Sequence, residues 1–306
     1  MFRKGRTPIA KAGMTEGINN QKGFTIMELL VASSLSAVIM GLVTANILTS
    51  NNVYFEDVIR TSINSNLRAG MDIISTNIRQ AGENLQPSFP AVEVLNGMGN
   101  APDTLILRRN KQAEVLTVCN DIIAGATLAE VSDDSRPNSV CKNVNASRLF
   151  DNFEAQRLED GGTTRIFLYN QVSNTGEFVE FSDTDLNTNI KMLISAPVNS
   201  YPAISSSIYL IEEFRFSLET ITETLELYIN GDLSTPAPVA FDTNQLSVRV
   251  EMQDGTILNN FDAGAGHVWK EIRQIRITLG GEVSRKSRTM SSSITAEYFP
   301  RNVLSS

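Results

Sequence analysis

The feature that most constrains this chain is a long apolar run close to its N-terminus. Residues 24–48 contain a single charged side chain, that of Glu28. Because an α-helix rises about 1.5 Å per residue, a run of this length can cross the roughly 30 Å hydrocarbon core of a bilayer. A carboxylate inside such a segment costs roughly 2.5 kcal/mol or more, which indicates that Glu28 has a function and a partner.

The position of a candidate cleavage site distinguishes this run from an ordinary secretory signal. A short basic leader precedes the run and ends in Lys22-Gly23. A secretory signal carries its small-residue cleavage site after the apolar region. The candidate site here, after Gly23, comes before that region, so the apolar helix would remain on the mature protein.

The sequence KGFTIMELLV at residues 22–31 resembles the class III signal of type IV prepilins and type II secretion pseudopilins. The resemblance implies that a prepilin peptidase cuts between Gly23 and Phe24 and methylates the new amine of Phe24. Glu28 then becomes the fifth mature residue, the family's assembly glutamate. The leader would begin at Met1 or at Met14, and both starts remain open.

Two interpretations of this segment are possible, and we prefer the one in which Glu28 pairs with a group on a neighbouring subunit. A buried carboxylate needs a cation, and the new N-terminal amine of a neighbouring subunit can supply one. Such a pair would also fix the axial stagger of one helix against the next. The alternative is a single-pass membrane anchor that tolerates a glutamate and does not polymerise.

Charge is distributed unevenly along the chain. The whole chain carries a formal charge of −8 and residues 1–23 carry +4, so residues 24–306 carry −12. A basic flank before a membrane helix predicts a cytoplasmic leader and a periplasmic or extracellular body. The resemblance to prepilins further implies a single pass of the bacterial inner membrane before assembly and an extracellular pilus afterwards.

The acidic body also bears on partners. Nucleic-acid binding needs clustered Lys and Arg to neutralise phosphates, so a nucleic-acid partner is not expected. The basic residues near the C-terminus are interpreted as ordinary solvated strand faces. These residues are Arg273, Arg276, Arg285, Lys286 and Arg288.

The two cysteines, Cys119 and Cys141, are expected to form a disulfide, because an exported chain meets an oxidising compartment. The bond would close a loop of about 20 residues and contribute roughly 3 kcal/mol to stability. Two free thiols, or half of a metal site, are the alternatives. A metal site would lack ligands, since the chain has one histidine.

The helix is expected to continue beyond the apolar run with a different character. Apolar residues recur there at steps of three and four, the pattern of one apolar helical stripe. The stripe consists of Val58, Ile59, Ile63, Leu67, Met71, Ile74 and Ile78. Gly82 and Pro87 predict where the helix stops. The chain would then divide into a leader at 1–23, a helix at 24–82 with its membrane part at 24–48, and a β-rich domain at 83–306.

Residues 78–82, IRQAG, are similar to the DIRxAG sequence that closes the first helix in PilW-type minor pilins. Asn77 stands where Asp is usual, so an ion pair made by that Asp is not carried over. An ordinary helix C-terminus, with Arg79 near the dipole and a glycine cap, explains the same residues locally. The sequence YFPRNV at 298–303 also resembles the end of those proteins.

Beyond Gly82 the apolar pattern changes to a period of two, which predicts strands. The predicted strands are residues 104–108, 113–119, 165–170, 177–181, 207–216, 225–229, 246–252, 272–279 and 291–299. Turn-forming residues separate several of them, including those at 230–232, 236–238 and 280–281, and residues 119–150 are predicted as a long loop. About nine strands without long helices between them predict antiparallel sheet, as two sheets or one curled sheet. The expected fold is α+β and, by the resemblance, pilin-like.

The residues that common catalytic sites require are largely missing. The one histidine, His267, has no nucleophile motif near it, and no phosphate-binding, dinucleotide or zinc-protease motif occurs. The sequence DTDLNTN at 183–189 resembles the start of a calcium loop but lacks its glycine and its final glutamate, so a plain turn is preferred. We expect no enzymatic activity, no cofactor and no metal.

Together with the resemblance, these features predict a minor pilin of a type IV pilus, most like the PilW type. The resemblance implies partners, namely other minor and major pilins, the prepilin peptidase and the inner-membrane assembly platform. The protein would prime assembly or cap the filament. A J-type pseudopilin of type II secretion is one alternative, although the 283 residues left after cleavage are many for that class. A tip adhesin or DNA-uptake pilin is the other, and no exposed aromatic or basic patch in the loops clearly favours it.

Overall fold

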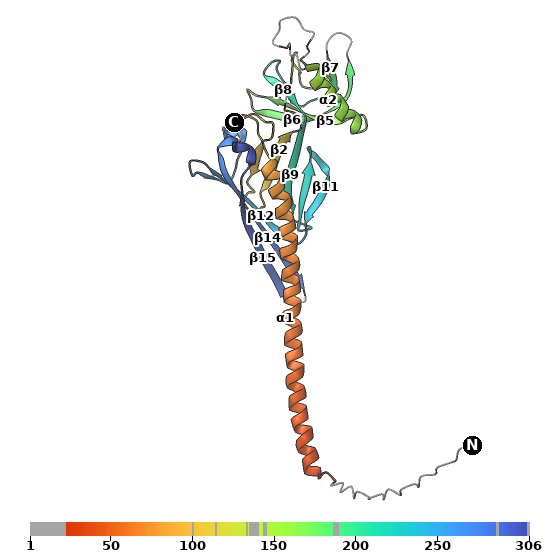
Figure 1. Cartoon of the computed structure of the whole chain (residues 1–306), viewed down its shortest axis with the longest axis vertical. Helices are drawn as coiled ribbons and strands as arrows, with labels where there is room; N and C mark the ends of the chain where they lie inside the picture. The colour runs from red at the N-terminus through yellow and green to blue at the C-terminus, as the bar shows by residue number, and fades with distance from the viewer. Residues whose placement is uncertain are drawn as a thin grey trace, which may run out of the picture. The chain divides into compact units, whose positions relative to one another are not determined.

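Figure 1 shows a computed structural model of the protein. It describes residues 23–99, 101–113, 115–132, 134, 141–142, 146–185, 190–285 and 288–304. The predicted leader up to Lys22, with the alternative start at Met14, lies outside these residues. The chain forms two compact units, residues 1–55 and residues 56–306, and each is described by itself.

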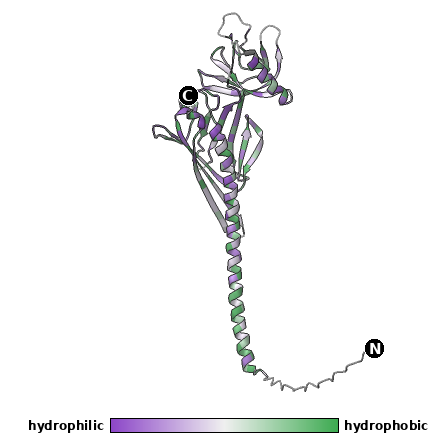
Figure 2. Cartoon of the chain, viewed as in Figure 1, coloured by the Kyte–Doolittle hydropathy of each residue, from purple (hydrophilic) through white to green (hydrophobic). Residues whose placement is uncertain are grey.

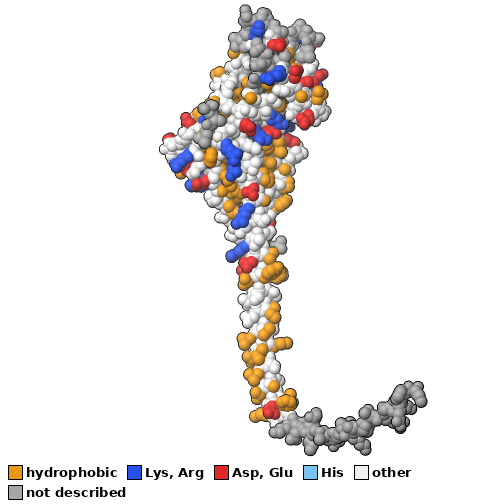
Figure 3. Space-filling model, viewed as in Figure 1, with side chains coloured by type: hydrophobic (Ala, Val, Ile, Leu, Met, Phe, Trp, Pro, Cys, Tyr) orange, Lys and Arg blue, Asp and Glu red, His pale blue; other side chains and the backbone are white. Residues whose placement is uncertain are grey.

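Helix α1, Ile26–Gln80, begins in the first unit. The side chains of α1 up to Phe55 are exposed, and many of them are apolar (Figures 2 and 3). In the described part of the chain, α1 is the one helix that is long and apolar enough to cross a membrane, judged by length and composition. A helix that is apolar on all sides is stable only when lipid or other protein covers it.

The part of α1 in the second unit is amphipathic. Its buried residues are Ile63, Leu67, Gly70, Met71, Ile74, Ser75 and Ile78. They follow the predicted stripe except at its first position, where Val58 is 47% exposed. Ile59 packs against the edge of the core, so burial of the stripe begins there and not at Val58.

Contacts from distant parts of the chain end α1. Gly82 has a φ of +80°, in the left-handed region that glycine tolerates. A Cβ at this position would lie 2.3 Å from the ring of Trp269, so a larger residue does not fit. The side chain of Asn302 donates hydrogen bonds to the carbonyl oxygens of Gln80 (3.3 Å) and Ala81 (3.1 Å). The C-terminal segment thereby satisfies carbonyl groups that a helix end leaves unpaired.

The β part of the second unit consists of three antiparallel sheets (Figure 1). The five-stranded sheet has the order β1-β2-β9-β10-β11, with bounds Val92–Leu95, Thr104–Asn110, Ile211–Glu219, Thr224–Ile229 and Asp232–Ala240. The four-stranded sheet has the order β13-β12-β14-β15, with bounds Ile257–Leu258, Thr243–Met252, Ile272–Arg285 and Arg288–Tyr298. The six-stranded sheet has the order β3-β8-β5-β6-β7-β4, with bounds Leu116–Thr117, Ser206–Tyr209, Thr164–Asn170, Thr175–Asp185, Lys191–Ile194 and Leu128–Glu130.

Two apolar clusters hold this unit together. The larger one packs the buried stripe of α1 against the five- and four-stranded sheets and includes Trp269. The smaller one joins the six-stranded sheet to helix α2, Ala146–Glu159, through residues such as Phe153 and Phe181. A helix packed on antiparallel sheet confirms the predicted α+β, pilin-like fold.

The prediction of about nine strands in one or two sheets is wrong, because the described residues alone form fifteen strands in three sheets. Residues 207–216 were predicted as one strand. The structure divides them into β8, which ends at Tyr209, and β9, which begins at Ile211, and these two strands belong to different sheets. Residues 208–211 are four consecutive apolar residues, all of them buried, so no alternation there marks the switch of pairing partner. The predicted loop at 119–150 contains β4 and the first turn of α2.

Two of the predicted turns lie inside strands. Residues 236–238, with Pro236 and Pro238, are part of β11, an edge strand in which a missing N–H is tolerated. Gly280 and Gly281 lie within β14. A Cβ on Gly281 would lie 2.5 Å from the carbonyl oxygen of Asp242 and 3.0 Å from a methyl group of Ile63. Glycine therefore permits close packing of the sheet on α1, and does not mark a turn.

Candidate functional site

The first turn of α1 is built around Thr25 and Glu28. The Oε2 atom of Glu28 accepts hydrogen bonds from the backbone N–H of Thr25 (3.0 Å) and from its hydroxyl (3.1 Å). The hydroxyl oxygen of Thr25 in turn accepts the backbone N–H of Glu28 at 3.3 Å. This is a capping box, in which an N-cap threonine and the third helical residue satisfy each other's backbone donors.

Sequence reasoning assigned Glu28 to a partner in another subunit and missed its partner within the chain. The Thr-x-x-Glu spacing at 25–28, ahead of an apolar run, is a signal from which this capping box could have been predicted. The two roles are compatible, because only Oε2 is engaged. In the described structure, the Oε1 atom of Glu28 accepts no hydrogen bond and remains able to pair with a cation.

The predicted cleavage site lies on open surface. Gly23 and Phe24 are exposed, and the Phe24 side chain has 83% of its area accessible. A Cβ on Gly23 would meet no atom within 4 Å. The structure thus places Gly23 and Phe24 just before α1 and Glu28 in the first turn of that helix. Nothing in the described part of the chain covers the bond between Gly23 and Phe24.

The surface around Glu28 is mostly apolar. The carboxylate borders a shallow hollow lined also by Thr25, Met27, Val31, Ala32 and Leu35. A second apolar helix that packs here would meet aliphatic side chains on all sides of one carboxylate. Transfer of that charge out of water makes an ionic partner strongly favourable.

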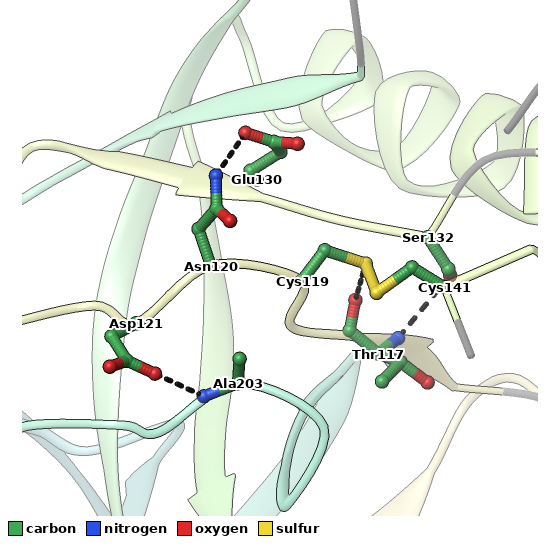
Figure 4. Close-up of a disulfide and its surroundings, with 8 residues drawn as sticks. All are labelled: Thr117, Cys119, Asn120, Asp121, Glu130, Ser132, Cys141 and Ala203. Atoms are coloured by element: carbon green, nitrogen blue, oxygen red, sulfur yellow. Dashed lines mark hydrogen bonds between the residues drawn. A yellow bond between two sulfur atoms is a disulfide. The ribbon is translucent and has the colours of Figure 1, made fainter. Parts of the chain in front are cut away.

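The structure joins Cys119 and Cys141 by a disulfide, with their Cα atoms 5.8 Å apart (Figure 4). Cys119 follows β3, and its backbone N–H donates to the carbonyl oxygen of Glu130 in β4 (2.8 Å). The next residues continue this anchoring, since the Asp121 carboxylate accepts the backbone N–H of Ala203 at 2.8 Å (Figure 4). The disulfide therefore fastens residue 141 beside the place where the two edge strands of the six-stranded sheet, β3 and β4, come together.

The remaining predicted residues have ordinary surroundings. The Nδ1 atom of His267 accepts the backbone N–H of Asp262 (3.1 Å), and its ring stacks on Phe261. Arg273 and Arg276 form ion pairs with Glu251 (3.0 Å) and Glu297 (2.6 Å). In the candidate calcium sequence, residues 183–185 are part of β6, and residues 186–189 lie outside the described residues, as do Lys286 and the side chains of Arg285 and Arg288.

Comparison with known proteins agrees with the geometry at the start of α1. The family described as "Prokaryotic N-terminal methylation motif" matches residues 18–44. The chain matches no curated protein and no solved structure. The matched residues contain Gly23, Phe24, Thr25 and Glu28 and the first part of the apolar helix. The chain therefore carries a prepilin-type N-terminal methylation motif on an apolar membrane helix, which supports a type IV pilin or pseudopilin.

Proposed function

We propose that this protein is a minor pilin of a type IV pilus that primes filament assembly or caps the filament. The observation that carries the proposal is the methylation motif at 18–44, which leads directly into an exposed apolar helix. The helix then continues into a β domain that buries its second half. A pilin subunit needs these parts in this order, because one half of the helix bundles with other subunits and the other half carries the body.

The proposed mechanism is packing, and no catalysis is involved. The prepilin peptidase would cleave between Gly23 and Phe24 and methylate the Phe24 amine. Before assembly, the apolar half of α1 would hold the chain in the inner membrane, with the acidic body in the periplasm. The assembly platform would then deliver the chain to other minor and major pilins, and the body would end outside the cell.

Glu28 would set the register between subunits. Its Oε2 caps its own helix, and its Oε1 would pair with the methylated amine of Phe24 in the next subunit. Helices with no other charge in the segment can slide along each other with little change in apolar contact. One ionic pair per subunit makes a single stagger favourable.

Mass spectrometry of filaments sheared from the cell surface tests the proposal. We expect a peptide that begins at N-methylated Phe24. A processed form confined to the cell envelope would favour a J-type secretion pseudopilin. A chain with its leader still attached to residue 23 would contradict every prepilin interpretation.

Three substitutions separate the two roles of Glu28. Glu28→Gln keeps an oxygen that can accept the Thr25 bonds but removes the charge, so we expect loss of incorporation into filaments. Thr25→Ala removes the cap but keeps the charge, at a cost of about 1 kcal/mol to the helix end, and should assemble. Glu28→Ala removes both the cap and the charge. Normal incorporation of Glu28→Gln, measured by immunoblot of sheared filaments, would show that the charge has no role in register.

A further inference from the structure

The outer face of the four-stranded sheet is polar along three neighbouring strands. Across β12 and β14, Gln245 pairs with Gly280, Ser247 with Thr278, and Arg249 with Arg276. The residues that alternate with them on β12, such as Val248, are buried in the larger core. Because side chains alternate between the two faces of a strand, the polar set shares the face turned away from the core.

Two arginines lie directly opposite each other on this face. Directly opposed residues of an antiparallel pair have Cβ atoms about 4.5–5.5 Å apart, and like charges in that position are destabilising. Arg276 is compensated by Glu297, whose Oε1 accepts its Nε at 2.7 Å. Arg249 is exposed, and in the described part of the chain it makes no ion pair or hydrogen bond.

The uncompensated charge is notable on a body that carries −12 over residues 24–306. Carboxylates are plentiful in this body, yet none of those described pairs with Arg249. An exposed guanidinium opposite another one is therefore available to an external anion. A carboxylate that reached both groups would also remove their mutual repulsion.

Arg249 borders a trough made of three hollows that share lining residues. One hollow is lined by Gln245, Ser247, Arg249, Arg276, Thr278 and Thr295. A second hollow shares Gln245, Ser247 and Arg249 and adds amides such as Asn96 and Asn259. A third shares Gln245 and includes Ser291 and Ser293 of β15, whereas the hydroxyl of Ser292 between them donates to Asn64 of α1. Amides and hydroxyls thus lie beside the arginine pair, together with the buried carboxylate of Asp103, whose oxygens accept the backbone N–H groups of Gly97 and Val248.

We propose that this trough binds a carboxylate-bearing polysaccharide, a polyuronate. One uronate carboxylate would lie between Arg249 and Arg276, and the amide and hydroxyl side chains would bond the sugar hydroxyls on either side. Single-stranded nucleic acid fits less well, because its binding uses stacked aromatic side chains and a dense row of cations. None of the described residues that line the three hollows is aromatic, and two are cationic. This gives the body an adhesive function in addition to its proposed role in assembly.

The test measures binding of the full chain, kept in non-ionic detergent, by biolayer interferometry at near-physiological ionic strength. The probes are polygalacturonate, its methyl ester, and a single-stranded oligodeoxynucleotide of similar length. The methyl ester keeps the same sugar chain without its charges. We expect binding of polygalacturonate alone. Absence of that binding, equal binding of the ester, or equal or tighter binding of the oligonucleotide would overturn the proposal.

Two matched variants locate the site. Arg249→Gln should weaken polygalacturonate binding at least about tenfold, because it removes a charged hydrogen bond. Its melting temperature should be unchanged or higher, because the opposed like charges are gone. Arg273→Gln removes the same charge from the same sheet, outside the trough, and should bind as the wild type does. Unchanged binding by Arg249→Gln, equal losses in both variants, or a loss accompanied by a lower melting temperature would contradict the assignment.

Discussion

Arg108 carries a buried positive charge that two carboxylates hold in the five-stranded sheet. Its Nε donates to Glu213 (2.7 Å), its Nη2 to Glu93 (3.0 Å) and its Nη1 to the carbonyl oxygen of Pro90 (2.7 Å). Burial alone would lower the pKa of Arg108, but the charges and hydrogen bonds of Glu213 and Glu93 outweigh it and raise that pKa. The group therefore stays charged and fixes where β1, β2 and β9 meet.

Removal of Arg108 should be costly because it leaves Glu213 buried without a partner. We expect Arg108→Ala to lower the free energy of unfolding by about 3–5 kcal/mol. Arg273→Ala, which breaks an ion pair whose arginine is 64% exposed, should cost no more than about 1 kcal/mol. Urea denaturation of the full chain in detergent measures both values. Equal costs would show that the Arg108 cluster is no stronger than a surface pair.

Glu177 gives the six-stranded sheet a dependence on pH. Its carboxylate accepts the backbone N–H groups of Val198 (2.9 Å) and Asn199 (2.8 Å) and the hydroxyl of Tyr201 (3.0 Å). Partial burial would raise the pKa of Glu177, but these hydrogen bonds outweigh it and lower that pKa in the folded state. The carboxylate also connects the start of β6 to the loop after β7.

A lowered folded-state pKa means that the charged form stabilises the fold. The contribution is complete above the unfolded pKa of about 4.3 and is lost as the pH falls through the lower folded pKa. Wild type should therefore melt above Glu177→Gln at pH 7, and this difference should shrink as the pH falls below the unfolded pKa. Glu180→Gln, at an exposed position of the same strand, is the control for the loss of one carboxylate from β6. A constant gap between wild type and Glu177→Gln would contradict the linkage.

At the scale of elements, the packing of α1 on the sheets depends on the buried apolar side chains of the helix. Leu67 is fully buried, whereas Ile73 is 39% exposed on the same helix. We expect Leu67→Ala to cost about 2–5 kcal/mol of unfolding free energy, and Ile73→Ala to cost well under that. Chemical denaturation followed by circular dichroism measures the difference. Similar costs would mean that the apolar stripe does not anchor the helix.

At the scale of the whole molecule, the charge asymmetry and the membrane helix predict which compartment the body occupies. If residues 56–306 are exported, Cys119 and Cys141 should form their disulfide in cells. A maleimide-polyethylene glycol probe should then label denatured chains only after reduction. A chain that lacks residues 24–48 should remain in the cytoplasm and label without reduction. Labelling of the unaltered chain before reduction would contradict export of the body.

Much of the element order could be predicted because it depends on local periodicity. The apolar run at 24–48, the position of Glu28 after Gly23 and Phe24, and the stripe from Ile63 to Ile78 are all visible as spacings along one segment. The change to a period of two after Gly82 likewise predicts antiparallel strands. The spacing of Thr25 and Glu28 also fits a helix capping box. This signal was not used in the prediction, because the same residues were interpreted as part of a membrane segment.

The sequence by itself determined that this chain has an apolar helix with one carboxylate, an amphipathic continuation and a β-rich body. Only the tertiary structure decided which strands share a sheet and that β8 and β9 separate at Leu210. It also decided that Gly281 lies within a strand that packs against α1, and not in a turn. It also placed Arg249 opposite Arg276. The physical reason is that helical and strand periods arise from neighbouring residues, whereas sheet order and register arise from contacts between residues far apart in the chain.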